Sequence, residues 1–233
     1  MRSLTAAIRA RQAEGLFAVI AEVKHRSAKE GDLLRGRDPV GYARLLAGQP
    51  VAGISVVTEP VHFGGSMDVL RAVAAAVDVP VLHKDFITTP AQVDASAQAG
   101  ADAILLIAEH LDDDLLEELA AHALAVGLEP LIEAHTAEEA RRVAAIETPL
   151  VGINNRDITI LEVDDTDVTR TQELAGLYPP GRVIVSESSI ADPDDARRAA
   201  LAGADAVLVG TAILRAEDPS GLLASLIGIG WPA

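Results

Sequence analysis

The chain has 233 residues, enough for one large α/β barrel or two small domains. Because 49% of the residues are hydrophobic but only 3% are aromatic, its core must consist mainly of Ala, Val, Leu and Ile. Its 19 basic and 35 acidic residues give a net charge of −16, so that neither nucleic acid nor a membrane surface is an expected partner. Cysteine is absent, which excludes disulfides and thiolate catalysis, and no signal core or run of about 18 apolar residues occurs, which predicts a cytoplasmic protein.

Strand and helix patterns alternate along the chain. Residues 2–14 have helical spacing and stop before Gly15. Eight short apolar segments then predict strands at residues 17–23, 51–57, 79–84, 102–107, 129–133, 149–154, 182–187 and 205–210. The amphipathic stretches between them predict helices at 39–48, 66–77, 90–100, 113–127, 136–146, 167–178, 192–203 and, briefly, 211–216.

Eight such units with no linker between them predict a single (β/α)₈ TIM barrel domain over residues 1–233, with a short helical segment at 1–16. An open doubly wound sheet is the alternative, but no G-x-G-x-x-G follows the first strand. The segment QAGADAILLI at 98–107 resembles LAGADAVLVG at 201–210, four units later. Either duplication of a half-barrel or chance similarity of two helix-to-strand corners would produce this repeat.

Charged and small polar residues follow the predicted strands. The third strand delivers Lys84 at its carboxyl end, and the other strands add Glu22, Lys24, Ser55, Glu59, Glu133, Asn154, Arg156, Glu187, Ser188, Gly210 and Thr211. A barrel brings these residues together at its C-terminal mouth. Several carboxylates, two lysines and an arginine in one pocket must pair and shift one another's pKa values, as at a catalytic site.

Two turns and two aromatic residues add detail to this mouth. Ser188-Ser189 and Gly210-Thr211 follow the last two strands, where small residues expose backbone N–H groups and commonly bind phosphate; an ordinary tight turn is the alternative. Phe63 and Phe86 lie just past strand ends and serve either as plugs at the barrel top or as a wall for an aromatic ring.

No metal or organic cofactor is expected. The six histidines show no metal-ligand spacing. The acidic runs favour helix starts and solvated helix surface over a metal site; they are Asp112–Asp114, Glu117–Glu118, Asp164–Asp165 and Asp194–Asp195.

Seven motifs resemble those of the indole-3-glycerol-phosphate synthase family of tryptophan biosynthesis. They are AEVK (21–24), ISVVTEPVHFGGS (54–66), HKDF (83–86), LIEAH (131–135), GINNRD (152–157), VSES (185–188) and DAVLVGTAILR (205–215). They cover nearly the whole chain from Phe17 onward, in the family's order and spacing. The resemblance implies that the substrate is a sugar phosphate with an aromatic carboxylate, 1-(2-carboxyphenylamino)-1-deoxyribulose 5-phosphate. The implied reaction is its cyclising decarboxylation and dehydration to indole-3-glycerol phosphate. The implied oligomeric state is a monomer or weak homodimer.

The same resemblance implies roles for individual residues. Lys84 is the expected general acid and Glu133 its acid/base partner, while Lys24 contacts anionic groups of the substrate and orients the acid. Glu22, Asn154, Glu187 and Ser188 complete the catalytic set. Arg156 is expected to bind the substrate carboxylate, and Ser27, Ser189, Gly210 and Thr211 to line the phosphate site.

Three departures from the family pattern leave alternatives open. Only sixteen residues precede the first strand, whereas the family usually has an extra N-terminal segment of some forty residues that folds over the mouth. Loss of most of this lid should weaken substrate binding, so we expect a raised KM unless the loop 27–37 covers the site. The family's Ser-Pro-Ser reads Ser27-Ala28-Lys29, and its Glu-Ser-Gly reads Glu187-Ser188-Ser189. The alternatives are a paralogue with a modified aromatic substrate, a phosphosugar isomerase, or a non-catalytic binding protein.

Overall fold

The computed structural model describes residues 2–27, 29–156 and 167–231. Eight parallel strands form a closed barrel in the order β1-β10-β9-β8-β7-β6-β5-β4, with β1 also paired to β4. This confirms the predicted TIM barrel and rules out the open sheet. The strands are β1 (Ala18–Val23), β4 (Gly53–Val57), β5 (Val81–Lys84), β6 (Ala103–Ile107), β7 (Glu129–Ala134), β8 (Leu150–Asn154), β9 (Val183–Glu187) and β10 (Ala206–Val209), each within two residues of its predicted bounds.

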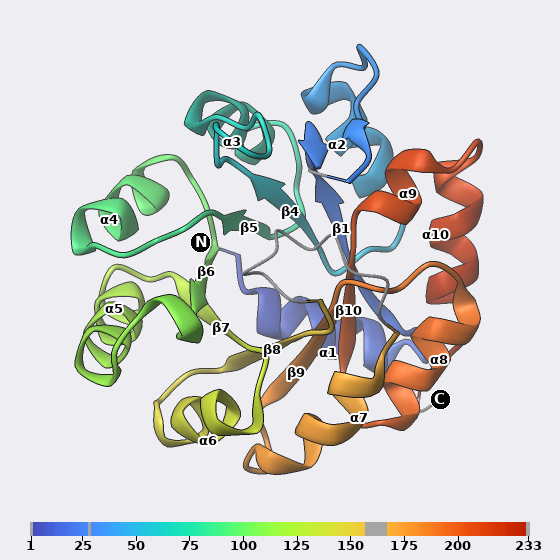
Figure 1. Ribbon diagram of the computed structural model, residues 1–233. Coiled ribbons are helices and arrows are strands. Elements are labelled where there is room, and N and C mark those ends of the chain that lie inside the picture. Colours follow the sequence, from blue (N-terminus) through green and yellow to red (C-terminus); the bar gives the residue numbers. More distant parts are fainter. Residues whose placement is uncertain (1, 28, 157–166, 232–233) are drawn as a thin grey trace.

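The helices surround the strands as an outer ring (Figure 1). Several begin at the side chains that the sequence marked as caps: Asp112, for example, accepts a hydrogen bond from the Leu115 N–H at the start of α5. The acidic runs at 112–114 and 194–195 do lie at helix starts, whereas Asp164–Asp165 lies outside the described residues. The ring comprises α2 (Pro39–Ala47), α3 (Met67–Ala74), α4 (Pro90–Gln98), α5 (Asp113–Ala125), α6 (Ala137–Ala145), α7 (Thr169–Leu174), α8 (Pro193–Leu201) and α10 (Pro219–Ile227).

Shorter elements line the loops after the strands. A short antiparallel hairpin follows β1; its strands, β2 (Arg26–Ser27) and β3 (Gly31–Asp32), have two residues each. Helix α9 (Thr211–Arg215) follows β10. The 3₁₀ turns η1 (Ala108–His110) and η3 (Ala175–Leu177) follow β6 and α7. Among the described helices, none has the length and apolar character needed to cross a bilayer.

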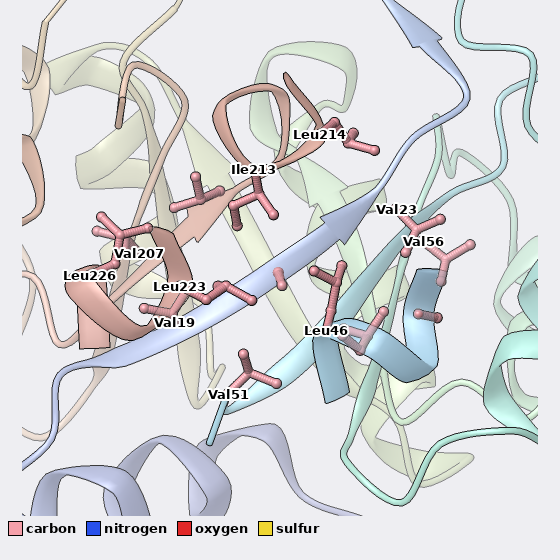
Figure 2. Close-up of a cluster of buried hydrophobic side chains, with 14 of the residues drawn as sticks. Val19, Val23, Leu46, Val51, Val56, Val207, Ile213, Leu214, Leu223 and Leu226 are labelled. Atoms are coloured by element: carbon pink, nitrogen blue, oxygen red, sulfur yellow. The ribbon is translucent and has the colours of Figure 1, made fainter. Parts of the chain in front are cut away.

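Aliphatic side chains fill the space between the strands and the helix ring. Figure 2 shows Val19 and Val23 of β1 among residues of α2, α9, α10 and the neighbouring strands, including Leu46, Ile213 and Leu223. A second aliphatic layer fills the barrel interior. Aliphatic side chains predominate in this packing, as the composition predicted, although Phe17 and Tyr42 also belong to the core.

The N-terminal helix α1 (Leu4–Ala13) closes the end of the barrel opposite the mouth (Figure 1). Leu4 and Ile8 are fully buried against the barrel interior. Arg9 Nη1 lies 2.5 Å from Asp205 Oδ1, and Arg2 Nε donates to Asp102 Oδ2 at 2.8 Å. Helix α1 is therefore a plug for the barrel floor and contributes nothing to the cover of the mouth.

Candidate active site

A cavity of about 620 Å³ opens at the carboxyl ends of the strands. Most of the predicted site residues line it, namely Glu22, Lys24, Phe63, Lys84, Phe86, Arg156, Ser188, Ser189, Gly210 and Thr211. Three predicted residues, Glu133, Asn154 and Glu187, are instead fully buried at the same strand ends and do not line the cavity. The strand ends therefore converge as predicted, but their side chains form two layers: one layer lines the cavity, and the other is fully buried.

Lys84 lies at the centre of the charged cluster. Its Nζ is 2.9 Å from Glu187 Oε2 and 3.9 Å from both Glu133 Oε2 and Glu22 Oε2. Glu22 has a second partner, because its Oε1 lies 2.9 Å from Lys24 Nζ. Two ammonium groups thus face three carboxyl groups, and such a cluster must hold protons or bind further positive charge.

Two glycines make room for the carboxyl groups. A Cβ atom at Gly152 of β8 would collide with Glu187 Oε1, and one at Gly210 after β10 would collide with Glu22 Oε1. The neighbouring strands therefore need glycine at these positions so that each carboxyl group can lie flat against the backbone and reach Lys84.

Burial dominates the protonation of Glu187. The side chain is fully buried, which raises its pKa from 4.5 to about 8; Glu133 acts in the same direction, whereas Lys84 opposes the shift. The pKa of Glu187 rises because one ammonium cannot compensate several buried carboxylates. Near neutral pH the cluster accordingly retains a proton that can be moved.

A histidine and a further carboxylate lie beside Glu133. His135 Nε2 is 3.4 Å from Glu133 Oε1, and His135 Nδ1 is 3.3 Å from Glu139 Oε2. The sequence analysis considered His135 only for metal binding and missed this contact. The signal was the spacing: residues two apart in an extended chain point to the same side, and His135 comes two residues after Glu133, just past the end of β7.

The turn after β9 has an unusual backbone. Ser188 and Ser189 have φ angles of 64° and 57°, in the left-handed region that favours glycine. Asn155, buried and also missed by the sequence analysis, stabilises this turn: its Nδ2 donates to the carbonyls of Glu187 at 3.0 Å and Ser188 at 3.3 Å, and its Oδ1 accepts from Thr171. Consecutive left-handed residues turn successive backbone N–H groups toward one side, a geometry that favours anions.

Ser27 is the remaining residue of the predicted set, and it lies beside the main cavity. Ser27 lines a small recess of about 20 Å³ next to the main cavity, together with Lys24, Phe63, Arg156 and Thr211. The Ser27 hydroxyl accepts a hydrogen bond from the Glu30 N–H at 3.1 Å, while Ala28 lies outside the described residues. Asn154 Oδ1 accepts a hydrogen bond from the Arg156 N–H at 3.0 Å.

The loop after β1 also reaches the mouth. Lys29 and Glu30 line the main cavity, and Glu30 Oε2 lies 2.8 Å from Arg215 Nη1 of α9. This ion pair joins the loop after β1 to the helix that follows the neighbouring strand β10.

Both phenylalanines line the cavity. Lys24 Nζ lies 5.8 Å from the centroid of the Phe63 ring, and the Phe86 ring lies 5.2 Å from that of His110. The loop that carries Phe63 is shaped by Glu59, whose carboxylate accepts hydrogen bonds from the N–H groups of residues 61 to 63. Of the two interpretations of these rings, the position at the cavity favours a wall for an aromatic ligand.

Within the described parts of the chain, no three His, Asp or Glu side chains are arranged to hold a metal ion. Lys24 and Lys84 are paired with the carboxyl groups of Glu22, Glu133 and Glu187. Their chemical capacity is proton transfer beside a set of cations that suits an anionic substrate.

Comparisons with known proteins agree with this geometry. A family model described as indole-3-glycerol phosphate synthase matches residues 1–226. A protein of that name from Pyrococcus abyssi is 44% identical over 209 residues, which make up 90% of this chain and 90% of that protein. Another from Nocardioides sp. is 46% identical over 212 residues, 91% of this chain and 80% of that protein. A third, from Halobacterium salinarum, is 46% identical over 213 residues, 91% of this chain and 82% of that protein.

Proposed function

We propose that this chain, which belongs to the indole-3-glycerol phosphate synthase family, carries out that family's reaction through Lys84 and the carboxyl groups around it. The protein is a carboxy-lyase of tryptophan biosynthesis. Its reaction closes the indole ring of 1-(2-carboxyphenylamino)-1-deoxyribulose 5-phosphate and releases CO₂ and water. Family membership decides against the phosphosugar isomerase, and the presence of Lys84 and Glu133 argues against a non-catalytic binding protein.

Each of the substrate's two anionic groups would have its own partners in the cavity wall. Its phosphate group would meet the N–H groups of the Ser188-Ser189 turn and of Gly210 and Thr211. The carboxylate would face Arg156, whose Nε is buried. The aromatic ring would then lie in the part of the cavity lined by the two phenylalanines. A volume of about 620 Å³ is within the range of small-molecule sites.

Lys84 would be the general acid for ring closure. Its ammonium would donate a proton to the ketone oxygen while the ring carbon that bears the carboxylate attacks the ketone carbon; loss of CO₂ then returns the electron pair to the ring. Dehydration would follow, with a second proton for the departing hydroxyl group and loss of a proton from the carbon next to nitrogen. Because Glu133 does not line the cavity, we infer that it exchanges protons with the substrate by way of Lys84.

The supporting observation is that Lys84 lines the cavity and at the same time contacts three carboxyl groups. Lys84→Met should reduce kcat at least tenfold in an assay that follows the fluorescence of indole-3-glycerol phosphate. The matched control is Lys29→Met, which removes another ammonium at the cavity wall and should act mainly on KM. Equal losses of kcat in the two variants would contradict a specific acid role for Lys84.

A further inference from the structure

Glu133 is sealed from the cavity. Its side chain is fully buried, and among the described residues neither carboxyl oxygen has a hydrogen-bond partner of good geometry. Besides Glu187, it has two basic neighbours, one at each oxygen: Lys84 Nζ is 3.9 Å from Oε2, and His135 Nε2 is 3.4 Å from Oε1. A proton can therefore reach Glu133 from the substrate side through Lys84 or from the other side through His135.

The contacts of His135 continue outward to α6. Its Nδ1 faces Glu139 Oε2 at 3.3 Å, and its backbone N–H donates to the same oxygen at 2.8 Å. The Thr136 hydroxyl donates to Glu139 Oε1 at 2.8 Å. The side chain of Glu139 is 12% exposed and that of His135 6%, so this end of the chain of contacts touches solvent whereas Glu133 does not.

The reaction itself requires a proton from solvent. Closure of the ring uses one proton at the ketone oxygen, dehydration uses a second at the departing hydroxyl group, and one proton is lost from carbon. The substrate carboxylate leaves as neutral CO₂, so each turnover consumes one proton overall. After turnover the Lys84 amine must regain a proton before the next substrate can react.

On the basis of the proposed function, we propose that His135 is a proton donor to Glu133 and that Glu139 keeps its imidazole oriented, so that the pair recharges Lys84 between turnovers. In the first step the Nε2–H bond of the imidazolium breaks and an O–H bond forms on Glu133. In the second step that O–H bond breaks and an N–H bond forms on the neutral Lys84 amine. His135 then regains its proton from solvent. The distances of 3.4 and 3.9 Å shorten in the working complex, as proton-transfer contacts commonly do.

The charges around His135 suit a donor. Burial works against the imidazolium, but the hydrogen bond to Glu139 and the charges of Glu133, Glu139 and Glu109 of η1 raise the pKa of His135 above its ordinary value. Glu139 stays ionised, because hydrogen bonds from His135 and Thr136 outweigh its burial and lower its pKa to about 2. Beyond Glu139, burial raises the pKa of the Tyr178 hydroxyl, so that this residue remains uncharged.

His135→Gln tests the relay by comparing single-turnover with steady-state kinetics of indole-3-glycerol phosphate formation. We expect a first turnover close to the wild-type rate, because Lys84 starts out charged, and a steady-state kcat at least tenfold lower. Glu139→Gln removes the carboxylate that raises the pKa of His135, so its kcat should decline at a lower pH than that of the wild type. A normal first turnover also shows that each variant is folded.

His122→Gln is the matched control, because His122 forms a similar pair with Asp94, at 2.8 Å, on the helix ring. It should leave both rates unchanged. The relay is refuted if His135→Gln keeps the wild-type kcat, or if it slows the first and later turnovers equally. The proposed function fails separately, if the wild type forms no indole-3-glycerol phosphate or if Lys84→Met keeps its first turnover.

Discussion

Replacing Lys84 with methionine should destabilise the fold in a pH-dependent manner as well as abolish turnover. A lysine at a strand end, beyond the packed layers, would by itself be expendable for folding. In the structure, however, its ammonium lies 2.9 Å from the fully buried carboxyl group of Glu187. Methionine retains the length of the aliphatic stem, so the substitution mainly removes charge.

The direction of the pH effect follows from Glu187. Its pKa is about 8 in the folded protein and 4.5 as the ordinary value, so the folded state binds an extra proton between these pH values. The stability from this proton is complete below pH 4.5 and is lost as the pH rises through about 8. Because Lys84 opposes the upward shift, its removal raises the folded pKa further and extends the loss to higher pH.

The magnitude should therefore depend on pH. At pH 6 Glu187 is protonated with or without Lys84, so the variant should lose roughly 1 kcal/mol, the value of one hydrogen bond. At pH 10 wild-type Glu187 is ionised and paired, and removal of its partner should cost about 3 to 5 kcal/mol. Urea unfolding followed by circular dichroism at the two pH values measures the difference.

The double variant Lys84→Met/Glu187→Gln is the control. It has no carboxyl group at position 187, so its free energy of unfolding relative to the wild type should change much less between pH 6 and pH 10 than that of Lys84→Met. If the free energy of unfolding of Lys84→Met changed between pH 6 and pH 10 by the same amount as that of the wild type, Glu187 would not be the group that Lys84 keeps ionised. The description of the cluster would then be wrong.

Three further substitutions test other parts of the structure. Gly152→Ala should push Glu187 away from Lys84 and lower kcat at least tenfold with little effect on KM, as steady-state kinetics would show; an unchanged kcat would contradict the need for glycine there. Ser189→Gly should raise the free energy of unfolding by roughly 0.5 to 1 kcal/mol in urea, because glycine adopts a φ of 57° without strain; a loss would mean that the hydroxyl group stabilises the turn. Ile8→Ala should lower that free energy by about 2 to 5 kcal/mol but leave kcat unchanged, and a matching loss of kcat would link the barrel floor to the mouth.

The strands could be predicted from the sequence because each is a short apolar run bounded by turn residues. Their polar ends could be predicted as a group, since a parallel barrel directs all carboxyl ends to one mouth. The two layers could not be predicted, because the depth of Glu133 relative to Lys84 depends on the register between β5 and β7. These strands are not neighbours: β6 lies between them. Periodicity along one strand carries no information on such a distance.

The partners of the site residues were missed for a similar reason. Asn155 looks like the second half of an Asn-Asn pair in a strand-end motif, yet it acts on the next strand by holding the carbonyls of Glu187 and Ser188. Nothing in its own neighbourhood along the chain predicts that contact. His135 is the exception, because it comes only two residues after Glu133, just past the end of β7, and the alternation of an extended chain predicts the same side for both.

The internal repeat explains how α1 finds the barrel floor. Asp102 and Asp205 occupy equivalent positions in the two copies, and each accepts a hydrogen bond at 2.9 Å from the backbone of the preceding strand, at Val81 and Ile184. The other oxygen of each carboxylate contacts α1 or the residues just before it. Two aspartates related by half a turn of the barrel thus receive Arg9, which lies in α1, and Arg2, which precedes that helix. Whether the repeat arose by duplication or by chance, its second aspartate is useful because a helix across the floor needs an anchor on each side.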